Sequence, residues 1–430
     1  MLNPMERHPI RLKLEGDLRR SRLTVGFRLL LALPHLVWWG LWGLAAQVAA
    51  IVGWFAVLLR GSLPGWAHDF LTSYIRYSAH LMSYLMLAGN PYPGFTGSEG
   101  SYPVDIEIPP PQRQSRWKTL IRLPLAIPAF LLAGVLGTFG LWTTSALGLA
   151  VVTGLGIAWT CAFLGWFVAL ALGRMPGGLR DFAAYAVGYS AQVNAYLSLL
   201  TDRYPTSDPE RIGPEWILPE HPVGLVLDDS ERRSRVTVLF RFLLVLPHLV
   251  WFYLWLVPAL LALIAAWFCA LVTGRVPSPL HRFLAAYVRY AVHFSAYLFL
   301  VANPFPGFTG GPGVYPVEVA IPGPERQSRW KTGFRLLLAI PALMLAGALA
   351  SALSIVAFLG WFAALVTGRM PAGLRNLGAV SLRYQGQTWA YLGLLTSRYP
   401  YASPATGREQ AGVREPLDQP LLVLGAETAP

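Results

Sequence analysis

Four long stretches without a charged side chain limit what this chain can fold into. No Asp, Glu, Lys or Arg occurs over residues 29–59, 123–173, 242–274 or 336–368. Each stretch is longer than the roughly 20 apolar residues that cross a bilayer as a helix. Only 13% of the 430 residues are charged, against about 25% in soluble proteins. The sequence therefore excludes a cytosolic globular enzyme and predicts an all-α polytopic membrane protein.

An internal repeat explains where these stretches occur. The residues R-R-S-R-L-T-V from Arg19 return as R-R-S-R-V-T-V from Arg232, and the same offset relates His8 to His221. A weaker similarity relates His8 to Tyr102 within the first half. Such self-similarity is typical of stacked repeat units. The chain divides into unit 1 (1–100), unit 2 (101–206, with an insertion of 18 residues), a linker (207–220), unit 3 (221–310), unit 4 (311–400) and a disordered tail (401–430).

Each unit reads as the same series of elements. The alternating segments H-P-I-R-L-K-L, Y-P-V-D-I-E-I, H-P-V-G-L-V-L and Y-P-V-E-V-A-I predict short strands, which we expect to pair between units; an extended linker is the alternative. Basic interfacial helices follow at 21–33, 115–127, 234–246 and 328–340. A proline at the end of each should break or kink the helix before the apolar span begins. A more polar second helix, residues 64–87 in unit 1, completes the unit.

Two spans in each unit give about eight transmembrane helices. Lys and Arg are concentrated in the termini, the connections between units and the basic helices, so these segments, the strands and both termini are predicted to be cytoplasmic. Two alternatives stay open. The second helices could lie along the membrane surface, and the insertion in unit 2 could form a hairpin that adds a span and inverts the second half. The excess of Arg over Lys fits a bacterial source, so we expect the bacterial inner membrane.

Two sets of polar residues are candidates for function. The basic helices supply candidate contacts to lipid headgroups at Arg22, Arg28, Arg116, Arg122, Arg235, Arg241, Arg329 and Arg335. The second helices carry a polar stripe made of Arg76, His80, Gln192, Arg289, His293, Arg383 and Gln387. Ionisable residues inside membrane segments suggest an ion or substrate path, although pairing with carbonyls or tyrosines is the simpler interpretation. The eight histidines repeat between units 1 and 3, and duplication explains them better than a metal site.

Five strings of residues resemble a known family. Y-P-V, then S-R, R-L-P-L-A-I-P, W-F-V-A-L-A-L-G-R and A-Y-L-S-L-L-T-D-R-Y-P follow one another over residues 102–205, and a similar series covers 315–400. This pattern is similar to a bacterial membrane family, domain-of-unknown-function family 4389, with diverged copies from His8 and His221. The insertion and the endings N-P-[YF]-P-G-F-T-G of units 1 and 3 depart from the pattern. The resemblance implies an integral membrane protein and carries no activity.

The expected function is structural. Nucleotide-binding, metalloprotease, redox and hydrolase motifs are missing, so we expect no enzyme and no cofactor. The net charge of +12 lies beside apolar segments rather than on a soluble module, which favours anionic membrane lipids over nucleic acid as partners. Protein partners and oligomeric state are not indicated. A scaffolding role on anionic lipid is the leading hypothesis, and a transporter or channel using the polar stripe is the alternative.

Overall fold

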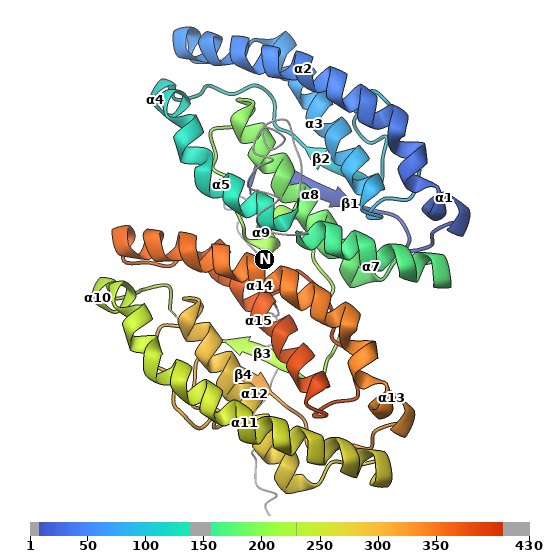
Figure 1. Ribbon diagram of the computed structural model, residues 1–430. Helices are drawn as coiled ribbons and strands as arrows, with labels where there is room; N and C mark the ends of the chain where they lie inside the picture. Colours follow the sequence, from blue (N-terminus) through green and yellow to red (C-terminus); the bar gives the residue numbers. More distant parts are fainter. Residues whose placement is uncertain (1–7, 138–155, 229, 407–430) are drawn as a thin grey trace, which may run out of the picture.

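The computed structural model describes residues 8–137, 156–228 and 230–406, in which the four units repeat one set of elements (Figure 1). The strands are β1 (Arg11–Leu14), β2 (Val104–Glu107), β3 (Gly224–Leu227) and β4 (Val317–Ala320). The short helices are α1 (Arg22–Gly26), α4 (Arg116–Leu120), α10 (Arg235–Leu239) and α13 (Arg329–Gly333). The long helices are α2 (Arg28–Arg60), α11 (Arg241–Thr273), α14 (Arg335–Thr367) and, in unit 2, the pair α5 (Arg122–Leu136) and α7 (Ile157–Leu172). The second helices are α3 (Gly65–Leu85), α8 (Gly177–Leu197), α12 (Ser278–Leu298) and α15 (Ala372–Leu392), and α9 (Pro209–Ile212) lies in the linker.

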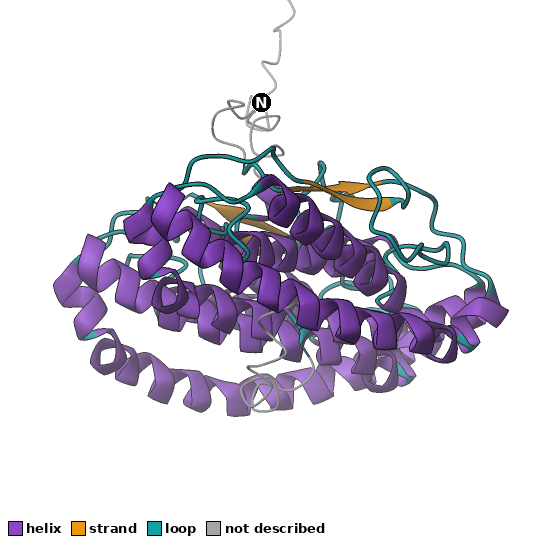
Figure 2. Ribbon diagram, turned by 90° about the horizontal axis from the view of Figure 1, so that it is seen from above, coloured by secondary structure: helices purple, strands orange, loops and turns teal. Residues whose placement is uncertain are grey.

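The elements form three layers. The strand layer and its loops lie on one side, the second helices form the middle layer, and the long helices form the opposite side (Figure 2). The middle layer contacts both of the others, because α3 packs against β2 and α2, and α12 packs against β4 and α11. All long and second helices run along these layers, not from the strand side to the far side (Figures 1 and 2).

The two units of each half are paired in antiparallel orientation. β1 pairs antiparallel with β2, with Leu12 opposite Ile106, and β3 pairs antiparallel with β4. Pairing of the strands between units, which the sequence predicts, is thereby confirmed, as two separate two-stranded sheets among the described residues. The same exchange occurs at the helices, since α1 packs against α7, α4 against α2, α10 against α14 and α13 against α11. The two halves meet where α14 packs on α5 and α7.

The predicted eight-span topology is not supported. Isolated β-bridges pair Arg19 with Arg174, Ser62 with Arg113, Arg232 with Arg369, and Arg275 with Arg326. Each bridge joins a connection predicted to be cytoplasmic to a turn predicted to lie across the bilayer, so the two segments cannot be on opposite sides. Among the described residues only α2, α11 and α14 are long and apolar enough to cross a membrane. The second helices instead form the buried middle layer.

The helix break before each long helix is not at the proline. Pro34, Pro247 and Pro341 lie inside α2, α11 and α14, and Pro128 lies inside α5. The predicted basic helices are therefore shortened to five residues, and in unit 1 the break falls at Phe27. A tryptophan of the paired unit explains this position, because Trp166 Nε1 donates to the Val25 carbonyl oxygen at 3.0 Å and so occupies an acceptor that a continuous helix would use internally. Equivalent tryptophans bond to the carbonyls of Thr119, Val238 and Thr332.

The insertion of unit 2, for which a hairpin was the alternative, interrupts the long helix of that unit. Most of it lies outside the described residues, but its two flanks meet closely, because a Cβ added to Gly156 would collide with the backbone of Gly137. The chain thus leaves α5 and returns to α7 at one point. Together, α5 and α7 occupy the place of one long helix, with α7 ending beside α1 as α14 ends beside α10.

Candidate functional site

In unit 1 the polar stripe attaches the middle layer to the strand layer. His80 Nε2 lies 3.1 Å from Asp105 Oδ1 on β2, and Arg76 Nε donates to the Ile106 carbonyl oxygen at 3.1 Å. Asp105 also accepts from the backbone amides of Gly100 and Ile106, each at 2.7 Å. Burial alone raises the pKa of the Asp105 carboxyl, but the hydrogen bonds from His80 and the two amides outweigh it and lower the pKa overall.

Unit 3 repeats this arrangement with a longer acid. Arg289 Nε lies 3.6 Å from Glu318 Oε1 and donates to the Val319 carbonyl oxygen at 3.2 Å, while His293 Nε2 lies 3.9 Å from Glu318 Oε2. Burial, helped by the charge of Arg289, lowers the pKa of His293 to about 4. Asp105 and Glu318 are not among the predicted site residues. Their signal is the repeat offset. Asp105 and Glu318 are 213 residues apart, and the same offset relates Arg76 to Arg289 and His80 to His293.

Units 2 and 4 have a glutamine at the position that a histidine occupies in units 1 and 3. Gln192 donates to the Ile10 carbonyl oxygen, just before β1, and accepts from the Thr206 amide, both at 3.0 Å. Gln387 makes the matching pair of 3.0 Å bonds to the Val223 carbonyl oxygen and the Tyr401 amide. Arg383 donates to the carbonyl oxygens of Ser403 and Ala405. The stripe residues are thus divided among four separate contacts, each of which fixes a strand or a chain segment to a second helix.

Four of the eight arginines assigned to lipid headgroups are buried. Arg28, Arg122, Arg241 and Arg335 are only 2–3% exposed, and each lies over the ring of a tyrosine on the second helix of its own unit at 4.2–4.6 Å. Arg28 Nη1 donates to the carbonyl oxygens of Tyr84 at 2.6 Å and Gly89 at 3.2 Å, at the end of α3. The prediction of headgroup contact is wrong for these four, because each guanidinium caps the negative end of a helix instead.

A second pair of arginines that the sequence analysis missed holds the adjoining turn. Arg20 and Arg233 are 4% exposed and donate to the carbonyl oxygens of residues 87 and 88 and of residues 300 and 301. Leu87 and Leu300 adopt positive φ angles of 60° and 62°, a conformation that L-residues avoid. The recurrence of R-R-S-R at Arg19 and Arg232 was the available signal.

The other four predicted headgroup arginines remain at the surface. Arg22, Arg116 and Arg235 each donate to a carbonyl oxygen in the last turn of the paired unit's long helix, at 2.8–3.0 Å, and Arg329 has the equivalent position in unit 4. The β-bridged turns bring further arginines beside them. The result is four edge clusters of three exposed arginines: Arg19, Arg22 and Arg174; Arg60, Arg113 and Arg116; Arg232, Arg235 and Arg369; and Arg275, Arg326 and Arg329.

The edge clusters carry net positive charge. Over residues 8–137, 156–228 and 230–406, none of these arginines is within salt-bridge distance of a carboxylate. The cluster of Arg275 and Arg326 borders a shallow hollow that Thr273, Val276, Pro277, Ser278 and Pro324 also line. Trp117 and Trp330, which follow Arg116 and Arg329, are 79% and 78% exposed. An exposed tryptophan beside a cationic group is typical of the boundary between lipid headgroups and hydrocarbon.

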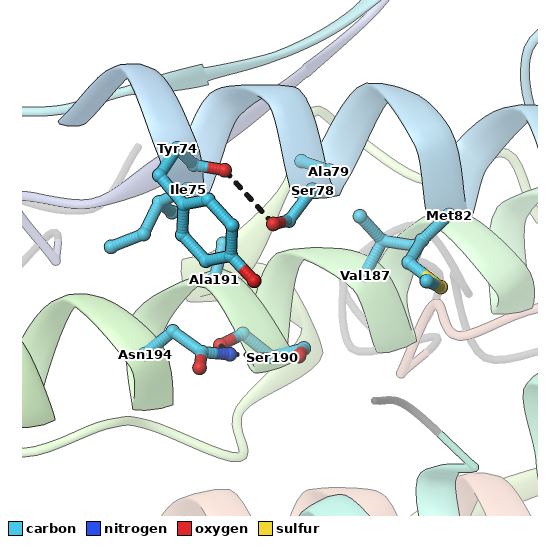
Figure 3. Close-up of a pocket in the computed structure, with 9 residues that line it drawn as sticks. All are labelled: Tyr74, Ile75, Ser78, Ala79, Met82, Val187, Ser190, Ala191 and Asn194. Carbon is cyan, nitrogen blue, oxygen red and sulfur yellow. Dashed lines mark hydrogen bonds between the residues drawn. The ribbon is translucent and has the colours of Figure 1, made fainter. Parts of the chain in front are cut away.

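A small cavity lies between α3 and α8, and Figure 3 shows the residues that face it. Its volume is about 20 Å³, and it is lined by Tyr74, Ile75, Ser78, Ala79, Met82, Val187, Ser190, Ala191 and Asn194. Ser78 donates to the Tyr74 carbonyl oxygen at 2.9 Å, and Asn194 donates to the Ser190 carbonyl oxygen at 2.8 Å. The polar groups of the wall are therefore largely satisfied by their own helices. The predicted stripe residues lie elsewhere, at the strand layer.

The histidines do not form a cluster. His35 bonds to Tyr77 at 2.8 Å and stacks on Phe95, with ring centroids 4.0 Å apart, and His248 makes the same contacts with Tyr290 and Phe308. Within the described part of the chain, no three His, Cys, Asp or Glu side chains are placed to hold a metal ion. The N-P-[YF]-P-G-F-T-G loops of units 1 and 3 thus fold back over a long helix, and His35 and His248 are part of that packing.

One family model matches the chain, and it does so once in each unit. It is described as a domain of unknown function, DUF4389, and it matches residues 22–96, 146–207, 235–309 and 329–403. No curated protein and no solved structure matches the chain. Since the four matches cover more than half of the sequence, the chain belongs to the DUF4389 family and contains four tandem copies of its domain.

Proposed function

We propose that this protein is a non-enzymatic structural component of a membrane, held in lipid by its long helices and bound to anionic headgroups through its edge clusters. One observation carries the proposal: the apolar outer face of the long-helix layer ends in exposed arginines. Leu29, Leu41 and Leu59 of α2 are 67%, 59% and 76% exposed, and Arg60, Arg113 and Arg116 follow at the end of the helix. The exposed leucines suit contact with lipid hydrocarbon, and the arginines that follow them suit contact with lipid phosphate.

Arginine chemistry favours phosphate as the ligand. A guanidinium presents a planar fork of donors that matches phosphate oxygens, and a positive cluster attracts the anionic lipids of a leaflet. In three of the four clusters, the arginine of the short helix is already fixed by its bond to a helix carbonyl, so little side-chain freedom is lost on binding. The bacterial cytoplasmic membrane, with both termini in the cytoplasm, is part of this proposal, and its support is the excess of Arg over Lys and the basic edges.

The alternative function, a transporter or channel that uses the polar stripe, has less support. Arg76 and His80 are bound to β2 and its approach, and Arg383 is bound to the segment that follows residue 400. Gln192 and Gln387 are engaged with backbone groups on both sides of their amides. A transport path would need these side chains to exchange such bonds for a passing ligand.

Lipid-dependent stability tests the proposal. The purified protein in a neutral detergent is heated with added phosphatidylglycerol, phosphatidylcholine or inorganic phosphate. Phosphatidylglycerol is expected to raise Tm, and the double variant Arg116→Gln, Arg329→Gln should reduce that rise, because it alters two of the four edge clusters. The control Arg11→Gln, Lys13→Gln removes the same charge from the strand layer, where both side chains pair with Glu107, and should keep it. An equal rise with phosphatidylcholine, or in the edge variant, would overturn the headgroup assignment.

A further inference from the structure

The apolar surface occupies one face of the molecule over its whole width. Exposed apolar side chains lie in both the first turn and the last turn of α2, α11 and α14. Phe242 and Val272 of α11 are 70% and 71% exposed, and Leu336 and Val366 of α14 are 75% and 74% exposed. A helix of 33 residues is about 50 Å long, against a hydrocarbon core of about 30 Å. Crossing would need a tilt beyond the 0–40° range of membrane helices.

The two ends of the long helices are chemically alike. Because paired units run in opposite directions, each edge carries the beginning of one long helix and the end of another. Arg22, just before α2, donates to the Ala171 carbonyl oxygen at the end of α7, and Arg235, before α11, donates to the Val366 carbonyl oxygen at the end of α14. Arginines therefore lie at both edges of the layer. A protein that spans a membrane usually has more Lys and Arg at one end of its helices than at the other, and the long helices here show no such difference.

The opposite face of the molecule is polar. On β1 and β2, Arg11 and Lys13 pair with Glu107 at 2.6 and 3.0 Å, and all three side chains are between 31% and 51% exposed. The strand layer lies over the middle of the helices and not beyond their ends (Figures 1 and 2). If the long helices crossed a bilayer, these charged side chains would be at the depth of the hydrocarbon, which is costly for each charge.

From these observations we infer that the long helices lie flat in a single leaflet. The inference rests on the proposed membrane function and adds to it the geometry and the partner surface, a lipid monolayer. The outer face of α2, α5, α7, α11 and α14 contacts acyl chains, the edge clusters bind phosphates in the plane of the headgroups, and the strand layer stays in water. Such a protein occupies area in one leaflet without adding area to the other, as in-plane amphipathic helices do.

Single cysteines at the two ends of one long helix test this geometry in intact spheroplasts. The background is Cys161→Ala, Cys269→Ala. Ser234→Cys and Ser278→Cys report the two ends of α11, and Ser101→Cys reports the approach to β2; all three serines are exposed. A membrane-impermeant maleimide should label all three from the same side, either all before permeabilisation or all only after it. Leu261→Cys, 64% exposed in the middle of α11, should resist labelling in both conditions.

The outcomes separate this inference from the proposed function. Labelling of Ser234→Cys and Ser278→Cys from opposite sides would show that α11 crosses the bilayer, and would overturn the flat arrangement while leaving the membrane assignment intact. Recovery of the protein in the soluble fraction would overturn both. If that soluble protein had twice the chain mass, the apolar layers of two copies would be covering each other instead of contacting lipid.

Discussion

The buried arginine at the start of each long helix gives a sharp test of how the layers are held together. Arg28 donates to two carbonyl oxygens at the end of α3 and lies 4.3 Å from the centre of the Tyr84 ring. We expect Arg28→Met to destabilise the protein strongly, although methionine keeps an unbranched, flexible side chain and buries no polar group. Arg22→Met, six residues earlier and exposed, removes the same charge at the edge.

The magnitude follows from the contacts. Each hydrogen bond from a charged donor contributes about 1.5–3 kcal/mol, and the cation–π contact contributes about 0.5–2 kcal/mol. The cost of burying the guanidinium, which is 2% exposed in Arg28, reduces the total. We therefore expect Arg28→Met to lower the free energy of unfolding by about 3–5 kcal/mol, and Arg22→Met by less than about 1 kcal/mol.

Unfolding in mixed micelles, followed by tryptophan fluorescence, measures both variants. A cycle with Tyr84→Leu isolates the ring contact and should give a coupling of about 1 kcal/mol. The reasoning is refuted if Arg28→Met costs no more than Arg22→Met, because the two arginines would then be equivalent contacts to lipid, as the sequence alone suggests.

Three other variants test the fold around the strand layer. Gly97 has a φ of +63° and its added Cβ would collide with the Ser73 carbonyl oxygen, so Gly97→Ala should cost more than about 2 kcal/mol in thermal unfolding, while Gly94→Ala, with open space around it, should cost little. Asp105→Asn should cost about 3–5 kcal/mol by leaving the buried His80 without its carboxylate, and an effect under 1 kcal/mol would contradict that role. His293 has a folded pKa of about 4 against 6.5 when unfolded, so the unfolded chain binds the proton first and stability should fall by up to about 3 kcal/mol as the pH drops from 6.5 to 4, less steeply in His293→Asn.

The strands and helices can largely be predicted from the sequence of one unit. The alternating segments predict strands that the structure places at residues 11–14, 104–107, 224–227 and 317–320, and the second helix predicted at 64–87 is α3. These predictions succeed because period two and helical spacing reflect which side of an element is buried. The prediction that fails locally, a helix break at Pro34, fails because the break depends on Trp166 of another unit.

The topology could not be predicted by counting basic residues. That count assumes that the two ends of an apolar helix lie on opposite sides of a membrane. Antiparallel pairing of units places Arg19 against Arg174 and Arg275 against Arg326, so residues from both predicted sides meet at one edge. Spacing along the chain also cannot show that Arg22 is exposed and Arg28 is buried. One contacts the end of a helix at the surface and the other the end of a helix in the interior.

The exchange of contacts between paired units has a consequence for how such a chain could arise. α3 packs on β2 and α8 on β1, and each short helix is held by a tryptophan of the other unit. A chain with one unit could complete these contacts only by meeting a second copy about a twofold axis. Fusion of two such genes would replace an encounter that depends on concentration with a fixed partner. It would also free the two positions to diverge, as the acid–histidine contact of units 1 and 3 and the glutamine contact of units 2 and 4 have done.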